Sequence, residues 1–143
     1  MNEPIEGATA SAELVVKHSD LASALPLNSA DAIPAGFATA RLVALMEIAS
    51  ARVLQPCLGA GQLSVGVSVD VMHSAPTPPG VVVTATARYL GRDGKLFDFE
   101  VVAFDAGGEV GRARHRRAIV DAQRLQANAD RRLAPVSAEA ARP

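Results

Sequence analysis

The chain has 143 residues, of which 49% are hydrophobic and 3% aromatic, and its formal net charge is −1. This length suits one domain with a single sizeable core built mainly from Val, Ala and Leu. The near-neutral charge gives no overall field that would favour nucleic acid or an anionic membrane. No apolar stretch reaches the length of a membrane span, and the first residues lack a basic start and an apolar signal core. We therefore expect a cytoplasmic protein.

The predicted elements, in chain order, are a strand, a long loop, one helix and four further strands. The first strand covers residues 10–17, and residues 18–35 form an irregular loop long enough to be a lid. The helix covers residues 36–54 and is ended by Pro56 and Gly59. The later strands are predicted at 62–73, 81–89, 96–104 and 110–120, with hairpin turns at 91–94 and 107–108.

This order predicts an α+β architecture of the type β-α-β-β-β-β, with an antiparallel sheet around one helix. The expected organisation is a flexible leader (1–9), one domain (10–121) and a frayed or disordered tail (122–143). The core face of the strand at 96–104 is expected to hold Phe97, Phe99, Val101 and Ala103.

The predicted helix carries a carboxylate with no charged partner on the same helix. At about 100° per residue, Arg41 and Arg52 lie within about 20° of each other and mark the solvent side. Glu47 lies about 120–140° from both, and its neighbours three and four positions away are uncharged. It is either a solvated residue on the flank of the helix or a carboxylate that needs a partner from elsewhere in the fold.

A histidine at the end of the next strand is the candidate partner. Residues 62–73 alternate with period two, which predicts one face made of Leu63, Val65, Val67, Val69, Val71 and His73. This face must pack on the only long apolar helix, which carries Thr39 and Glu47. A hydroxyl, a carboxylate and an imidazole at one helix–sheet contact are the groups that activate or orient a nucleophile.

The set Thr39, Glu47 and His73 resembles hotdog-fold thioesterases of the fluoroacetyl-CoA thioesterase type. The similar motifs are Phe-Ala-Thr-x-x-x-Val-x-Leu-Met-Glu-x-Ala from residue 37, His-Ser-Ala-Pro-Thr-Pro-Pro-Gly from residue 73 and His-Arg-Arg-Ala-Ile from residue 115. The resemblance covers residues 37–120. It implies a five-stranded hotdog fold, Thr39, Glu47 and His73 as the catalytic trio, and Gly66 and Arg117 as substrate-binding residues. It also implies a homodimer, or a higher oligomer, formed through the strand at 62–73, with sites at the subunit interface.

Two departures bear on the substrate. Fluoroacetate-specific members carry bulky aromatic residues in the lid just before the helix, whereas residues 28–35 contain none. The small-residue turn after the family's threonine is replaced by Ala40 and Arg41. We therefore expect weak discrimination for a fluorinated acyl group.

Each candidate residue also has a purely structural interpretation. Thr39 lies near the helix start, where threonine commonly bonds the backbone. His73 could be a hydrogen-bonded core histidine, and Gly66 could mark a bulge or a close approach of the backbone. The arginines within 112–117 suit a solvated face, coenzyme A phosphates or weak RNA contact, although no aromatic platform for bases accompanies them.

Other chemistries have less support. The histidines at 18, 73 and 115 lack metal-ligand spacing, and no glycine-rich phosphate loop precedes a helix. The leading hypothesis is a thioesterase that hydrolyses a short or modestly bulky acyl-CoA to free acid and CoA. It needs no separate cofactor, because coenzyme A is part of the substrate, and no nucleic acid or membrane partner. The alternative is a non-catalytic acyl-CoA-binding hotdog module. A hydratase is disfavoured by the absence of an Asp-to-His spacing before the helix. A covalent acyl-enzyme and direct attack by water remain open.

Overall fold

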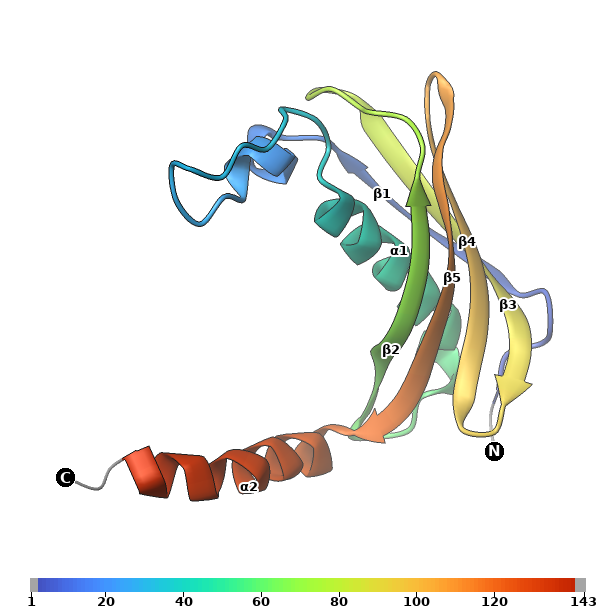
Figure 1. Ribbon diagram of the computed structural model, residues 1–143. Helices are drawn as coiled ribbons and strands as arrows, with labels where there is room; N and C mark the ends of the chain where they lie inside the picture. The colour runs from blue at the N-terminus through green and yellow to red at the C-terminus, as the bar shows by residue number, and fades with distance from the viewer. Residues whose placement is uncertain (1–2, 141–143) are drawn as a thin grey trace.

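Helix α1 (Thr39–Leu54) lies on the concave side of a curved antiparallel sheet in the computed structural model (Figure 1). The structure describes residues 3–140, with the side-chain surroundings of residues 3–135. The strands are β1 (Thr9–Val15), β2 (Gln62–His73), β3 (Val82–Asp93), β4 (Leu96–Asp105) and β5 (Gly108–Asp121). Their order across the sheet is β1-β3-β4-β5-β2, which makes β2 an edge strand. The predicted α+β architecture, a five-stranded antiparallel sheet around one helix, is confirmed.

The core forms between one side of α1 and the concave face of the sheet. The buried side chains of α1 are Leu42, Leu45, Met46, Ala49, Ser50, Val53 and Leu54. The predicted core face of β4 is confirmed. Each of the four residues on this face is at most 2% exposed; they are Phe97, Phe99, Val101 and Ala103. Burial of these apolar side chains is the main term that stabilises the helix on the sheet.

Strand β2 contains a β-bulge that the sequence pattern conceals. Gly66 pairs with Arg117 and Ser68 pairs with Arg116, so that Val67 is an extra residue with no partner in β5. Because paired residues share a face, Gly66 faces the helix together with the buried Arg117.

The bulge corrects the predicted face of this strand. Beyond it, the residues that face α1 are Val69, Val71 and His73, which pair with His115, Ala113 and Gly111. Before it, the residues that face α1 are Ser64 and Gly66. The prediction that Leu63 and Val65 share a face with His73 is therefore wrong, since one inserted residue exchanges the two faces.

The hairpin between β3 and β4 also turns later than predicted. Asp93 pairs with Leu96, which leaves Gly94 and Lys95 as a two-residue loop. Gly94 has a φ of 63°, a left-handed conformation that glycine adopts readily. Strand β3 thus continues through the predicted turn to Asp93.

The segment between β1 and α1 is irregular but tied to the core at its base. It contains two short 3₁₀ helices, His18–Asp20 and Ala22–Ala24. The backbone N–H of Ala38 donates to the carbonyl of Asp20, and that of Phe37 donates to the carbonyl of Thr77. The rest of the segment extends away from the sheet beside the start of α1 (Figure 1), where a lid would lie.

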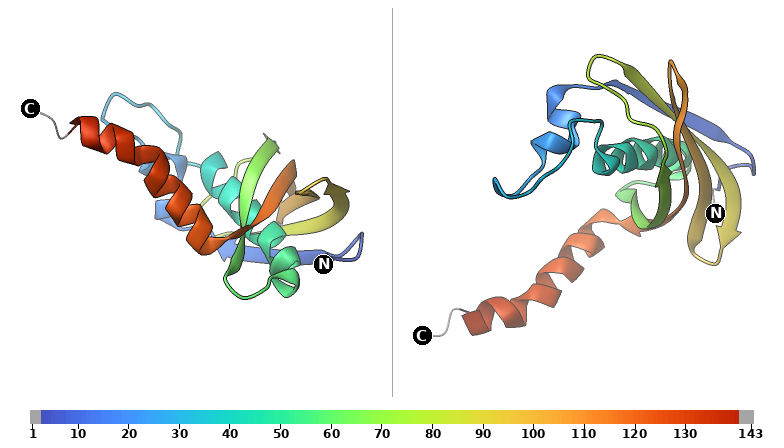
Figure 2. Two further views of the ribbon diagram at one scale, coloured as in Figure 1. Left: turned by 90° about the horizontal axis from the view of Figure 1, so that it is seen from below. Right: turned by 45° about the horizontal axis from the view of Figure 1, so that its top comes forward.

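Residues 122–140 form helix α2 (Ala122–Ala140), which projects from the end of β5 away from the sheet (Figure 2). Residues 1–2 of the predicted leader and 141–143 of the predicted tail lie outside the described residues, and the division of the chain into leader, domain and tail stays a prediction. None of the helices within residues 3–140 combines the length and apolar character needed to cross a membrane.

Candidate functional site

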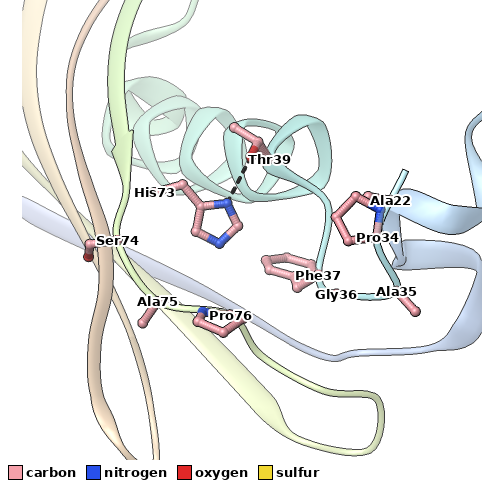
Figure 3. A pocket seen from close by; sticks show the side chains of 10 residues that line it. All are labelled: Ala22, Pro34, Ala35, Gly36, Phe37, Thr39, His73, Ser74, Ala75 and Pro76. Atoms are coloured by element: carbon pink, nitrogen blue, oxygen red, sulfur yellow. Dashed lines mark hydrogen bonds between the residues drawn. The ribbon is translucent and has the colours of Figure 1, made fainter. Parts of the chain in front are cut away.

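The start of α1 and the end of β2 bring Thr39 and His73 together. Thr39 is the first residue of the helix, and the preceding Ala38 is the N-cap residue. Thr39 Oγ1 shares a hydrogen bond of 2.8 Å with His73 Nδ1 (Figure 3). Its hydroxyl is therefore directed to the sheet and not spent on the helix backbone, the alternative that the sequence left open.

A pocket of about 420 Å³ opens beside this pair. It is lined by Ala22, Pro34, Ala35, Gly36, Phe37, Thr39, His73, Ser74, Ala75 and Pro76. The second ring nitrogen of His73, Nε2, points away from Thr39 toward the space between Phe37 and Pro76 (Figure 3). It is buried and makes no hydrogen bond to any residue that the structure describes. A buried imidazole nitrogen without a partner is costly unless a bound molecule or water satisfies it.

Phe37 is a pocket residue that the sequence analysis did not single out. Its side chain is 3% exposed, and its ring meets the His73 ring edge-on with centroids 6.5 Å apart. Residues 28–35 do lack aromatics, but this ring, two positions later, supplies one to the pocket wall. Its position in the Phe-Ala-Thr motif is the sequence feature that could have predicted its place at the site.

Glu47 lies eight residues beyond Thr39 on α1, which is about 12 Å along the helix axis. Its Oε1 lies 3.4 Å from Nη1 of Arg117 on β5. The Glu47 side chain is 41% exposed, whereas that of Arg117 is 8% exposed. The expectation of a partner from elsewhere in the fold is met by Arg117. No hydrogen bond joins Glu47 to Thr39 or His73 among the described residues, so one protomer does not assemble the predicted trio.

Gly66 lies directly under the Glu47 carboxylate. A β-carbon built on Gly66 would collide with Glu47 Oε1 and would also lie 3.4 Å from Cε1 of His115. Gly66 does not have a positive φ, so space and not backbone conformation calls for glycine here. Both structural interpretations considered for this glycine, a bulge and a close approach, therefore hold.

All three guanidinium nitrogens of Arg117 have hydrogen-bond partners within the protein. Its Nε donates to Ser64 Oγ at 2.9 Å, and its Nη2 donates to the Ser64 carbonyl at 2.9 Å. Its Nη1 faces both Glu47 and the Nε2 of His115, the latter at 3.2 Å. Burial lowers the pKa of Arg117 and the nearby Glu47 charge raises it, but a guanidinium stays cationic. Arg117 thus braces Glu47, and its predicted contact with substrate stays a prediction.

His115 and Ser64 are the other residues of this cluster that the sequence analysis did not assign to the site. His115 is 2% exposed, and its Nδ1 donates to the Ser68 carbonyl at 2.8 Å. Burial has the largest effect and lowers the pKa of His115; the hydrogen bond to Ser68 raises it by less, the Arg117 charge lowers it, and the Glu47 charge raises it. The sequence feature that could have predicted this contact is the alternation of β5, which places His115 on the same face as Arg117.

The remaining arginines of β5 lie on the other face of the sheet and have carboxylate partners. Arg112 pairs with Glu109 at 2.6 Å. Arg114 pairs with Glu100 at 3.7 Å, and Arg116 pairs with Asp93 at 2.9 Å and with Asp98 at 2.8 Å. This arrangement supports a solvated, charge-balanced face and does not favour a phosphate-binding strip.

No group of three or more His, Cys, Asp or Glu side chains within the described part of the chain could hold a metal ion. The groups that the site does bring together are a hydroxyl–imidazole pair at a pocket and a braced carboxylate farther along the helix that carries the hydroxyl.

A curved five-stranded sheet around one helix, with these groups where the helix faces the sheet, defines a hotdog-fold protein of the thioesterase superfamily. The chain belongs to the family described as fluoroacetyl-CoA-specific thioesterase, which matches residues 16–123. The resemblance stated from the motifs is confirmed.

Individual relatives agree with this assignment. The fluoroacetyl-CoA thioesterase of Streptantibioticus cattleyicolor is 38% identical over 94 residues, which are 66% of this chain and 68% of that protein. A solved structure of the fluoroacetyl-CoA thioesterase FlK superposes with a TM-score of 0.84 and 31% identity, covering 91% of this chain and 98% of FlK. A thioesterase superfamily member from Thermus thermophilus superposes with a TM-score of 0.86 and 25% identity, covering 96% and 99% of the two chains.

Proposed function

We propose that this protein is a hydrolase that converts a short or modestly bulky acyl-CoA thioester to the free acid and CoA. The observation that carries the proposal is the Thr39–His73 hydrogen bond at a pocket into which the unpartnered His73 Nε2 points. Membership of a thioesterase family supports the reaction class. Coenzyme A enters as part of the substrate, and the proposal involves no separate cofactor.

His73 acts as a general base or as a stabiliser of charge near the thioester. When Thr39 donates to Nδ1, Nε2 carries the proton and donates to the thioester carbonyl oxygen. When Nδ1 carries the proton, Nε2 accepts a proton from water. Thr39 holds the imidazole ring in place in both states, so its hydroxyl is the group that matters.

Glu47 is the carboxylate that attacks the thioester carbonyl or activates a water molecule. Its partial exposure leaves it accessible to substrate, and the contact with Arg117 orients it.

We also propose that the protein acts as a homodimer that pairs through β2. This edge strand is long and carries exposed apolar side chains, an arrangement that favours pairing with another strand. The exposed fractions are 36% for Leu63, 53% for Val67, 41% for Val69 and 69% for Met72. Since no hydrogen bond joins Glu47 to His73 within the described residues of one chain, we propose that each active site combines His73 of one protomer with Glu47 of the other. A cytoplasmic location remains part of the same prediction.

The first test is a thiol-release assay with a panel of acyl-CoA substrates of increasing chain length. We expect turnover with saturation kinetics, and at least about a hundredfold loss of turnover for both Glu47→Gln and His73→Ala. Tight binding of acyl-CoA with no turnover across the panel would favour the non-catalytic binding module instead.

Subunit complementation tests the shared site. Glu47→Gln and His73→Ala proteins are each inactive alone, and mixing them under conditions of subunit exchange forms mixed dimers. If a site uses His73 of one chain and Glu47 of the other, each mixed dimer has one intact site, and activity returns. If both groups act within one chain, the mixture stays inactive and the shared site is wrong.

A further inference from the structure

We propose that His115, as a neutral imidazole, is the positioning residue that fixes Arg117 against the Glu47 carboxylate. The inference rests on the proposed function only where it concerns catalysis. Its structural part concerns three groups on β5 and α1 that lie in contact within one protomer.

The hydrogen-bond partners of His115 dictate a single protonation state. Its Nδ1 lies 2.8 Å from the Ser68 carbonyl oxygen, which can only accept, so Nδ1 carries a proton. Its Nε2 lies 3.2 Å from Nη1 of Arg117, which can only donate, so Nε2 is unprotonated. The ring is therefore neutral and has one defined tautomer.

This tautomer presents an acceptor to Arg117. Nη1 has two N–H groups, one directed to Glu47 Oε1 at 3.4 Å and the other to His115 Nε2. The Ser64 contacts hold Nε and Nη2, and since the guanidinium is planar they also place Nη1, whose second N–H then has His115 Nε2 as its buried acceptor. Removing that acceptor leaves a buried donor unsatisfied and weakens the hold on the end of the guanidinium that faces Glu47.

Protonation of His115 would disrupt the same contact. It would replace the acceptor with an N–H directed at a guanidinium and bring two positive charges together. The charged groups that face His115 are Arg117 from β5, which opposes protonation, and Glu47 from α1, which favours it. Phe99 of β4 packs near the ring, with centroids 6.4 Å apart, and contributes burial but no charge. Burial is the largest of these effects and lowers the pKa of His115.

Nitrogen-15 NMR of the imidazole rings tests the structural part without any need for turnover. The His115 signals are assigned by their absence from the spectrum of His115→Gln, and the exposed His18 provides an internal comparison. We expect His115 at pH 7 to have a protonated Nδ1 and an unprotonated Nε2, and to remain so as the pH falls through 6.5. A proton on Nε2 at pH 7, in either the other tautomer or the imidazolium, would overturn the inference.

Two variants test the positioning role. His115→Asn keeps an N–H near the Ser68 carbonyl but has no atom near the position of Nε2, whereas His115→Gln puts an amide oxygen there as an acceptor. We expect His115→Asn to lower kcat about tenfold to a hundredfold with little change in KM, the size of one lost hydrogen bond to a charged group. His115→Gln should recover most of that loss. Equal losses in the two variants would mean that the ring serves only packing, and the positioning role would be wrong.

The experiments distinguish failure of the proposed function from failure of the positioning role of His115. An inactive wild-type protein with the expected His115 tautomer would remove the proposed function and keep the bracing of Arg117. An active wild-type protein in which His115 is an imidazolium at pH 7 would keep the function and remove the bracing.

Discussion

The carboxylate of Glu47 occupies the space that a side chain on Gly66 would fill. The helix and the bulged edge strand are fitted to each other at this point, since a β-carbon on Gly66 would collide with Glu47 Oε1. Any larger residue at position 66 must therefore move the carboxylate away from Arg117.

Gly66→Ala tests this relationship. We expect the fold to persist, because Gly66 has no positive φ, and kcat to fall at least about tenfold because the carboxylate is displaced. The control is Gly59→Ala, whose β-carbon would meet only the flexible Gln62 side chain at 3.2 Å. Turnover and melting temperature should be measured on both variants. Unchanged kcat in Gly66→Ala would show that the position of the carboxylate is not critical.

Substitutions at Thr39 separate its hydroxyl from its methyl group. Thr39→Ser keeps the oxygen that bonds His73 Nδ1, and Thr39→Ala removes it. We expect Thr39→Ser to retain more activity than Thr39→Ala by about tenfold, since one hydrogen bond that orients the imidazole is lost. Thiol release at saturating substrate is the measurement. Equal activity in the two variants would assign the hydroxyl no part in turnover.

The stability of the protein should depend on pH through His115. Its pKa is lowered in the folded state, so below about pH 6.5 the unfolded chain binds a proton that the folded chain does not. The free energy of unfolding should therefore fall as the pH falls below 6.5. This fall should stop once the pH is below the pKa of His115 in the folded state. Denaturant unfolding of wild type and His115→Gln between pH 7 and pH 5 measures this. The difference in stability between them should narrow toward low pH, and parallel curves would contradict the prediction.

A charge on the edge strand should weaken the proposed dimer. Val67 is 53% exposed at the bulge of β2, and a lysine there places a charge against the paired edge of the partner. We expect Val67→Lys to raise the dissociation constant of the dimer at least about tenfold. Leu27→Lys adds the same charge at a residue that is 96% exposed on the loop before α1 and serves as the control. Sedimentation over a range of concentrations reports both, and equal behaviour would exclude β2 as the interface.

Selectivity for fluorine should be modest. The predicted lid lines the pocket with Ala22, Pro34 and Ala35, none of them aromatic, and Phe37 follows it as an aromatic residue of the pocket wall. Hydrophobic pockets distinguish similar acyl groups by about 1–3 kcal/mol, so we expect fluoroacetyl-CoA to be favoured over acetyl-CoA by no more than about two hundredfold. The ratio of the two kcat/KM values measures this. A ratio of many thousands would show that one aromatic ring in the wall is sufficient for discrimination.

Most of the fold could be predicted from local sequence patterns. Pro56 correctly marked the end of the helix, and alternation correctly gave the core face of β4, because both depend on residues close in sequence. The bulge at Val67 left no such signal. Valines flank it on both faces of the strand, so the alternation in sequence looks unbroken while the register in space shifts.

The site was predictable where spacing and motif were specific. The Thr39–His73 contact followed from the helix and strand assignments together with the resemblance. The partner of Glu47 did not follow, because Arg117 lies 70 residues away and its choice depends on the register of β5 against β2. The role of His115 was not predicted, because the tautomer of a neutral ring has no sequence signature. The sequence shows only that His115 and Arg117 lie on the same face of a strand.

The bulge in β2 also has a consequence for odd and even positions. Gly66 and His73 differ in parity, so an unbroken strand would present them on opposite sides of the sheet. The one unpaired residue, Val67, lets an even-numbered glycine and an odd-numbered histidine face the same helix. Deleting Val67 would restore strict alternation and turn one of the two outward. One inserted residue thus determines that the glycine under the Glu47 carboxylate and the histidine beside the pocket lie on the same face of β2.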